Sequence, residues 1–210
     1  MIGLADVEAA RARVAHAVEP TPLWPSPALA ALAGRDVRLK LESLQRTGSF
    51  KIRGAMNRLA TLPEAARARG VLTASAGNHA QGVAFAARAF GVPATIVMPE
   101  QTAIVKIEAT RALGARVVLH GATYDEAYAR ALALVAETGA VFVPAFDDDA
   151  VIAGQGTVGL ELADQCPEAG VVVLPVGGGG LAAGCAVALK ARLPRVRVVG
   201  VQAAGAAAAV

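Results

Sequence analysis

The chain has 210 residues, of which 55% are hydrophobic, 18% charged and only 4% aromatic, and its formal net charge is +3. Such an apolar chain can bury enough surface to offset the entropy lost on ordering, which excludes an intrinsically disordered protein. Its basic residues are scattered rather than gathered in a stripe, so the charge pattern gives no support to nucleic-acid binding. We expect one ordinary domain or two small ones around an aliphatic core.

The amino-terminal segment and the cysteines indicate a cytoplasmic protein. Charges such as Asp6 and Arg13 interrupt the first residues, which argues against a signal peptide. No apolar stretch reaches the roughly 18 residues that a membrane span needs. Cys166 and Cys185 form no C-x-x-C pair, and we expect both to be reduced, buried thiols.

Short apolar segments alternate with longer helical patterns along the chain. In chain order we expect a helix at residues 6–18, an extended turn at 21–23 and a half-buried strand at 37–42. Further helices are expected at 50–62, 78–90, 103–113, 124–138, 152–165 and 181–193, and further strands at 71–74, 94–98, 116–119, 141–143, 171–176 and 196–201. This alternation predicts an α/β fold of βαβ units, in which helices cover both faces of parallel sheets.

Ligands of such sheets bind beyond the carboxyl ends of the strands. The turns of interest therefore follow Ala74, Met98, Leu119, Val143 and Val176. Two of these turns, and one helix start earlier in the chain, have compositions that point to chemistry.

One of these turns is a run of four glycines. Gly177, Gly178, Gly179 and Gly180 precede Leu181, so backbone N–H groups at a helix amino terminus are left unobstructed, which suits a phosphate. No lysine, serine or threonine stands at the spacing of a Walker loop, which argues against a nucleoside triphosphate. The alternative is a flexible turn, although four glycines cost much conformational entropy for a turn alone.

A second turn is rich in hydrogen-bonding groups. It reads Ser75, Ala76, Gly77, Asn78 and His79. A backbone nest with polar side chains suits a carboxylate. Ser75 and Asn78 are also good helix-capping residues, so capping alone is the alternative.

The third segment places a lysine at the start of a helix. It reads T-G-S-F-K-I-R-G-A over residues 47–55, with the lysine at Lys51. A helix amino terminus disfavours a cation, so this position should lower the pKa of Lys51 and favour the neutral amine that Schiff-base chemistry needs. The alternative is an ordinary solvated lysine.

Other segments look functional but have simpler explanations. Residues 154–159 match G-x-G-x-x-G, but no acidic residue ends the next strand, and we expect these glycines to allow close helix packing. The three aspartates at 147–149 are expected to be solvated or capping. His16 and His120 lack metal-ligand spacing, so no metal site is predicted.

Together these segments resemble the threonine dehydratase (threonine ammonia-lyase) family. The resemblance is carried by T-G-S-F-K-I-R-G-A at 47–55, S-A-G-N-H-A-Q-G at 75–82, L-H-G at 119–121, V-I-A-G-Q-G-T at 151–157 and V-G-G-G-G-L at 176–181. It runs over essentially the whole chain, in family order. It implies fold type II of the pyridoxal-phosphate enzymes, with pyridoxal 5'-phosphate as cofactor.

The family fold implies two parallel-sheet αβα domains. Residues 67–146 would form the smaller one, and residues 1–66 with 147–210 would form an incomplete larger, cofactor-binding one. Catalytic regions of the family are longer than this chain, so we interpret the end at 206–210 as a truncation. The serine or cysteine that contacts the pyridine nitrogen is expected beyond it, and an uncovered core predicts a large exposed apolar patch.

The matched motifs also imply individual roles. Lys51 would bind the cofactor as a Schiff base, Phe50 would pack on its ring, and Asn78 would hydrogen-bond the 3′-oxygen of the ring. The backbone of residues 177–181 would hold the phosphate, and residues 75–79 would surround the substrate carboxylate.

The resemblance implies α,β-elimination from an amino acid. Lys51 would remove the α-proton as a general base while the cofactor takes up the electrons. Threonine would give 2-oxobutanoate and ammonia, and serine would give pyruvate. We expect a cytoplasmic enzyme of amino-acid metabolism, including isoleucine biosynthesis, whose partners are small amino acids and not nucleic acid or membrane. Its parent protein is expected to be a homo-oligomer.

Three alternatives stay open. The first is a serine racemase. Racemases of this fold have the pattern S-S-G-N-H at this turn, and their second serine moves a proton. Ala76 stands at that position here, which argues against racemisation. Racemase-type members also have a divalent metal site near the positions of Gln202 and Ala208, so we predict no such site. The second alternative is a hydroxyaspartate dehydratase relative, and the third is a catalytically impaired fragment that binds the cofactor.

Overall fold

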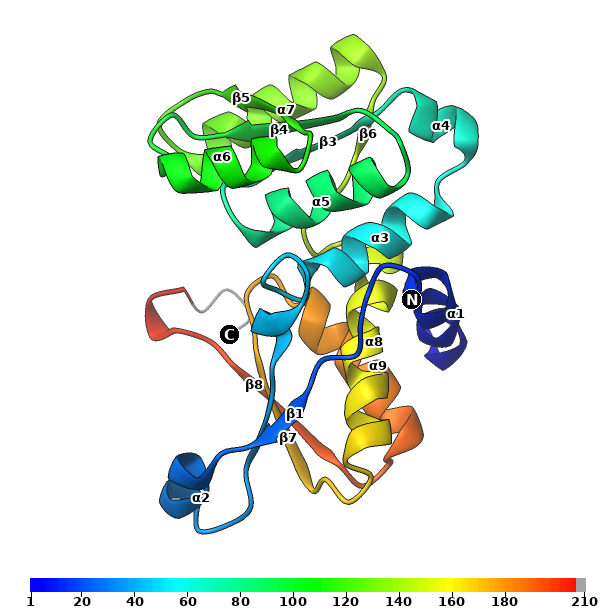
Figure 1. The fold of residues 1–210 in the computed structure, drawn as a ribbon, viewed down its shortest axis with the longest axis vertical. Helices are drawn as coiled ribbons and strands as arrows, with labels where there is room; N and C mark the ends of the chain where they lie inside the picture. The colour runs from blue at the N-terminus through cyan, green and yellow to red at the C-terminus, as the bar shows by residue number, and fades with distance from the viewer. Residues whose placement is uncertain (207–210) are drawn as a thin grey trace.

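The computed structural model of the protein describes residues 1–206 (Figure 1). Its α-helices are α1 (Leu4–Val14), α2 (Pro27–Ala33), α3 (Lys51–Thr61), α4 (Glu64–Ala68), α5 (Asn78–Ala89), α6 (Ile104–Ala112), α7 (Tyr124–Thr138), α8 (Asp149–Gln165) and α9 (Gly180–Arg192), and short 3-10 turns are η1 (Glu42–Leu44) and η2 (Ala204–Ala206). Its strands are β1 (Leu23–Pro25), β2 (Arg38–Lys40), β3 (Val71–Ala74), β4 (Ala94–Met98), β5 (Arg116–Leu119), β6 (Val141–Phe142), β7 (Val171–Pro175) and β8 (Arg197–Val201).

Strands β3 to β6 form one parallel sheet in the order β5-β4-β3-β6. Val71 of β3 lies opposite Ala94 of β4 and opposite Val141 of β6. Because the strands run in the same direction, their carboxyl ends lie at one edge of the sheet, where the chain leaves β3 for α5 and β6 for α8. The predicted α/β fold with parallel pairing is confirmed.

Both faces of this sheet are covered by helices. Side chains alternate along a strand, so Val71 and Ile96 pack with α3 and α5, while Leu72 and Val97 pack with α7. Figure 1 shows α5 and α6 on one face of the sheet and α7 on the other. This double cover explains why β3 and β4 are apolar apart from one threonine each, Thr73 and Thr95.

Helix α3 lies between this sheet and the α8–α9 pair (Figure 1). It contacts α5 on one side and α8 on the other. Most of its residues are therefore buried, including Ile52, Arg53 and Met56. The start of α3, with Lys51, consequently lies at the junction of the two parts of the molecule.

The β7–β8 pair is parallel, with Val171 opposite Arg197. Val172 and Leu174 pack against α8 and α9, but Val173 is 61% exposed. Among the described residues, helices therefore cover only one face of this pair, and the expectation of cover on both faces is wrong here. Exposed valines lie on this face, while the predicted large apolar patch stays a prediction.

The β1–β2 pair is antiparallel and forms a sheet of its own, with Leu23 opposite Lys40. The expected extended turn at 21–23 therefore leads into a strand, whose first residue is Leu23. The expected strand at 37–42 shortens to three residues, because Glu42 begins η1.

The sequence prediction missed two short helices, α2 and α4. Helix α2 begins at Pro27 and ends before Gly34, whose φ is 64°, and α4 follows Pro63. Proline at a helix start and glycine just past its end are the local signals of such helices. The alanine-rich composition of both segments hides their periodicity.

The glycines of the G-x-G-x-x-G match allow close helix packing, as predicted. A Cβ atom at Gly156 would lie 2.8 Å from the carbonyl oxygen of Gly184, and one at Gly159 would lie 2.9 Å from the Cα atom of Cys185. A Cβ at Gly154 would overlap the backbone of Arg53. The backbone of helix α8 therefore packs directly against the backbones of both α9 and α3.

The aspartate run has the capping role that the sequence suggested. The side chain of Asp148 accepts a hydrogen bond from the Val151 N–H at 2.9 Å and pairs with Arg58. Both cysteines are free, but only Cys185 is buried, because Cys166 ends α8 at the surface and is partly exposed. The expectation of two buried thiols is therefore wrong for Cys166.

Candidate active site

One short connecting segment, residues 143–146, contacts all three motifs that the sequence singled out. It joins β6 to α8 at the carboxyl edge of the four-stranded sheet. His79 bonds to its first residue, Lys51 bonds to Ala145, and the glycine run (residues 177–180) packs on Phe146. The fold thus brings the three motifs together around this connecting segment.

Lys51 is the first residue of α3, and its Nζ donates a hydrogen bond to the carbonyl oxygen of Ala145 at 2.8 Å. The same Nζ lies 5.3 Å from the centroid of the Phe50 ring. Burial lowers the pKa of the Lys51 amine. The sequence predicted this direction from the helix dipole, whereas the structure gives burial as the cause. A lowered pKa increases the fraction of neutral, nucleophilic amine near neutral pH.

His79 lies in the first turn of α5 and is 4% exposed. Its Nε2 lies 3.0 Å from the carbonyl oxygen of Val143. A carbonyl only accepts, so Nε2 carries the proton and Nδ1, which has no partner among the described residues, carries the lone pair. Burial lowers the pKa of His79 to about 4, so the ring is neutral at physiological pH. The His79 side chain therefore offers no positive charge to a carboxylate.

The α5 turn, residues 75–79, is shaped by a serine. Ser75 Oγ accepts hydrogen bonds from the backbone N–H groups of Gly77 at 3.2 Å and Ala80 at 3.3 Å, so the capping alternative holds for this side chain. The N–H groups of Asn78 and His79 belong to the first helical turn, where an α-helix provides no internal acceptor. Donors placed in this way suit an anion.

The glycine run connects β7 to α9 and needs its glycines for two reasons. Gly179 has a φ of 89°, and a Cβ atom at Gly177 or Gly179 would face open space. At Gly178 a Cβ would overlap the ring of Phe146, and at Gly180 it would lie 2.9 Å from the carbonyl oxygen of Phe146. The run therefore combines a left-handed turn with close packing, and it leaves N–H groups uncovered at a helix start.

The other predicted site residues support this arrangement from the core. Leu181 packs among α8, α9 and β7, and Phe50 packs against the same cluster beside the Lys51 amine. Thr47 Oγ1, in the same motif as Lys51, is buried and has no partner among the described residues. The lysine motif thus contains a polar atom that the protein itself leaves unsatisfied.

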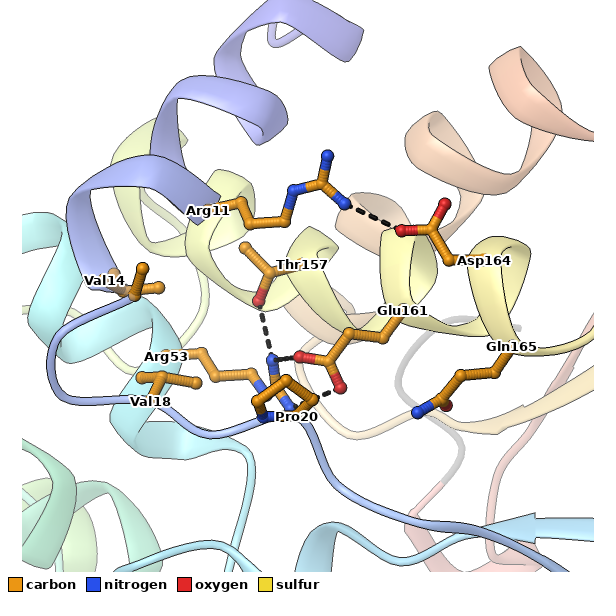
Figure 2. A pocket seen from close by; sticks show the side chains of 10 residues that line it. Arg11, Val14, Val18, Pro20, Arg53, Thr157, Glu161, Asp164 and Gln165 are labelled. Atoms are coloured by element: carbon orange, nitrogen blue, oxygen red, sulfur yellow. Dashed lines mark hydrogen bonds and ion pairs between the residues drawn. The ribbon is translucent and has the colours of Figure 1, made fainter.

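A buried ion network holds α3 on α8, and the sequence reasoning missed it. Arg53 is fully buried, pairs with Glu42 and Glu161, and donates from Nη1 to Thr157 at 3.1 Å. Lys40 adds a second cation against Glu161. Figure 2 shows Arg53 between Thr157 and Glu161. The sequence held one signal for this network: Arg53 stands among residues of α3 that are mostly apolar and buried.

A cavity of about 420 Å³ lies between α1 and α8, next to this network (Figure 2). Its charged lining groups pair with one another: Arg11 with Asp164 at 2.9 Å, and Arg53 with Glu161. None of the predicted site residues lines it. It is therefore separate from the region where the three motifs meet.

Within residues 1–206, no group of three or more His, Cys, Asp or Glu side chains is placed to hold a metal ion. Of the two positions considered for a racemase-type metal, Gln202 donates to the carbonyl oxygen of Gly177 at 3.3 Å, and Ala208 lies outside the described residues. None of the helices in the described part of the chain is long and apolar enough to cross a membrane.

Known proteins are similar to this chain in both sequence and fold. The L-threonine ammonia-lyase of Thermotoga maritima is 54% identical over 202 residues, which is 96% of this chain and 50% of that protein. The processed form of threonine deaminase isoform 2 from Solanum lycopersicum superposes with a TM-score of 0.91 at 44% identity, covering 95% of this chain and 54% of that one. Maize serine racemase gives a TM-score of 0.92 at 37% identity, covering 94% and 60% respectively.

The chain thus spans about half the length of this Thermotoga maritima protein. A family model described as pyridoxal-phosphate dependent enzyme matches residues 14–210. These likenesses, together with the parallel α/β architecture, show that the chain belongs to the pyridoxal-phosphate dependent enzyme family and has its type II fold.

Proposed function

We propose that this chain is the cofactor- and substrate-binding part of a threonine ammonia-lyase that also accepts serine. The observation that carries the proposal is the meeting of Lys51, the α5 turn and the glycine run around residues 143–146. The relatives named threonine ammonia-lyase and threonine deaminase support the choice of substrate.

The residues present fit pyridoxal phosphate. The glycine run offers N–H groups at the start of α9, with open space beside Gly177 and Gly179, and would hold the phosphate. Lys51 has a half-buried amine with a lowered pKa and would bind the cofactor covalently. Phe50 lies beside that amine and would pack on the ring, while the exposed Asn78 at the start of α5 would bond its 3′-oxygen.

The substrate carboxylate would bind at the α5 turn. The free N–H groups of Asn78 and His79 would donate to it, within a turn that Ser75 shapes. The neutral ring of His79 is fixed on Val143 and would hold the turn in place. Gly77 leaves this approach unobstructed, because a Cβ there would meet no atom within 4 Å.

Lys51 would act as the general base. When bound, pyridoxal phosphate supplies an electron sink for the electrons released at the substrate Cα. The Lys51 amine would accept the α-proton, and its lowered pKa increases the neutral fraction that is able to do so. The carbonyl of Ala145 orients Nζ at 2.8 Å. Loss of the α-proton and the β-hydroxyl from threonine, followed by hydrolysis, gives 2-oxobutanoate and ammonia.

Serine racemisation is the second candidate, because maize serine racemase has a closely similar fold. A racemase needs a proton donor on the face opposite the lysine. Ala76 provides only a methyl group at the position where the racemase pattern has a serine. This residue favours elimination, and the configuration of serine recovered after incubation with the D or L form distinguishes the two. A hydroxyaspartate dehydratase would act on hydroxyaspartate in preference to threonine and serine, so offering the three substrates in turn distinguishes it.

Several wider expectations belong to the same proposal. We propose that residues 67–146 form the smaller domain, which is supported by the four-stranded sheet and helices α5, α6 and α7 lying within these bounds. We also propose a cytoplasmic homo-oligomer whose product can serve isoleucine biosynthesis. Size-exclusion chromatography with light scattering tests the oligomeric state.

The test of the site is a visible absorption spectrum of the purified protein with pyridoxal phosphate. We expect an absorption band in the visible region. It should disappear in Lys51→Ala and persist in Lys106→Ala, because Lys106 is an exposed lysine of α6. A band that survives Lys51→Ala would contradict the assignment. Formation of 2-oxobutanoate from threonine then separates an enzyme from an impaired fragment that only binds the cofactor.

A further inference from the structure

We propose that Gly82 is a positioning residue, whose missing side chain sets the distance between Lys51 and the α5 turn. The inference rests on the proposed function, because it concerns the same lysine and the same turn. Gly82 is buried in α5 and was not among the residues expected to act in the site.

The contact at Gly82 is made with the backbone that carries Lys51. A Cβ atom at Gly82 would lie 3.1 Å from the carbonyl carbon of Lys51, 3.2 Å from its oxygen and 3.2 Å from the nitrogen of Ile52. These distances are tighter than ordinary van der Waals contact. A side chain could rotate away, but a helix backbone cannot, so any atom added here must move one helix relative to the other.

The same helix carries the turn that would bind the substrate carboxylate. Gly82 follows Asn78 by four residues, which is about one helical turn, so the two lie on one face of α5. The turn and the Gly82 contact are therefore parts of one rigid element. A displacement of α5 at Gly82 displaces the N–H groups of Asn78 and His79 with it.

Helix α3 cannot yield to such a displacement, because its opposite side is fixed on α8. Arg53 pairs with Glu161 of α8, and the Gly54 N–H donates to Gln155 Oε1 at 3.1 Å. A Cβ at Gly154 would already overlap the Arg53 backbone, so no space exists behind α3. The strain from a methyl group at position 82 is therefore relieved by movement of α5, and the turn moves away from Lys51.

The substitution Gly82→Ala separates positioning from stability. Alanine is the better helix former, and this gain offsets the packing strain that remains after α5 has moved, so we expect no fall in Tm. A misplacement of about 1 Å can cost about 100-fold in rate, so a shift of a few tenths of an ångström should lower kcat about 3- to 10-fold. KM should change less than about twofold, because the carboxylate-binding turn moves as an intact unit. The larger Gly82→Val should lower kcat further.

The matched control is Ala89→Gly, which changes the glycine content of the same helix at an exposed position. Because Ala89 is the last residue of α5, this change should alter Tm little and leave kcat unchanged. A Gly82→Ala variant with the kcat of the wild type overturns the proposal, and so does one whose Tm falls together with its kcat. Absence of the Lys51-dependent absorption band in the wild type would instead contradict the proposed function.

A second measurement needs no bound cofactor. Crystal structures of the wild type and of Gly82→Ala give the distance between the Cα atoms of Lys51 and Asn78. We expect this distance to increase by a few tenths of an ångström, with α3 unmoved on α8. An unchanged distance, or a shift of α3 instead of α5, overturns the proposal whatever the kinetics show.

Discussion

Lys51 Nζ and the carbonyl oxygen of Ala145 lie 2.8 Å apart, although the two residues are 94 positions apart in the chain. The bond ties the start of α3 to the segment that leaves the parallel sheet. That segment also contacts His79 and the glycine run. The Lys51 amine has this one hydrogen-bond partner from the described part of the protein, and burial lowers its pKa and so favours its neutral form.

The packing of Phe146 on the glycine run can be tested by adding one methyl group. Gly178→Ala should lower the Tm of the cofactor-free protein, because its Cβ would overlap the Phe146 ring, and overpacking typically costs about 1–3 kcal/mol. Gly177→Ala is the matched control, since a Cβ there faces open space.

The partner substitution completes the test. Phe146→Ala removes the ring, so the double variant Gly178→Ala/Phe146→Ala should lose less stability than the two single changes together. Additive losses in a double-mutant cycle would show that the two residues do not interact. Thermal unfolding followed by circular dichroism is sufficient.

Removal of the buried guanidinium should be strongly destabilising. Arg53→Met leaves Glu42 and Glu161 without their main cation, and breaking a buried pair in this way costs about 3–5 kcal/mol. The control is Arg46→Met, which removes a surface arginine paired with Glu19 and should cost less than about 1 kcal/mol. Urea unfolding measures both values. Equal losses for the two variants would contradict the importance of the network.

The buried imidazole should make the protein sensitive to acid. His79 has a folded-state pKa of about 4 against an ordinary value of 6.5, so the unfolded chain takes up its proton at higher pH than the folded one. Above about pH 6.5 His79 is neutral in both states and costs no stability. As the pH falls from 6.5 towards 4, the unfolded chain is protonated first, so the free energy of unfolding decreases.

This pH dependence is measured as Tm between about pH 7 and about pH 4.5. We expect His79→Gln to lose less stability over this range than the wild type, because a glutamine amide does not titrate. His120→Gln changes an exposed histidine and should follow the wild type. The same acid loss in His79→Gln as in the wild type would show that another group is responsible.

The two thiols should differ in reactivity. Cys185 is fully buried, and burial raises its pKa to about 12, so its reactive thiolate is scarce. Cys166 is partly exposed at the end of α8. A thiol reagent should therefore label Cys166 in the native protein and both cysteines after unfolding. Mass spectrometry of the labelled peptides identifies the site, and early labelling of Cys185 would contradict its burial.

The sequence alone determined the local features of this protein. The strands of the four-stranded sheet, the glycine run, the polar turn before α5 and the lysine at the start of α3 were all readable, because hydrogen-bonding capacity, glycine conformation and periodicity are properties of neighbouring residues. The motifs also predicted the family. The sequence did not reveal α2 and α4, because these segments are short and rich in alanine and carry little periodic signal.

Only the tertiary structure decided how these pieces meet. The contact of Gly82 with the Lys51 backbone, the burial of Arg53 between Glu42 and Glu161, and the packing of Phe146 on the glycine run join residues that are distant in the chain. Burial lowers the pKa of Lys51, a cause that the sequence reasoning from the helix dipole did not include. Desolvation and close packing depend on what surrounds a residue in space, which a single sequence does not specify.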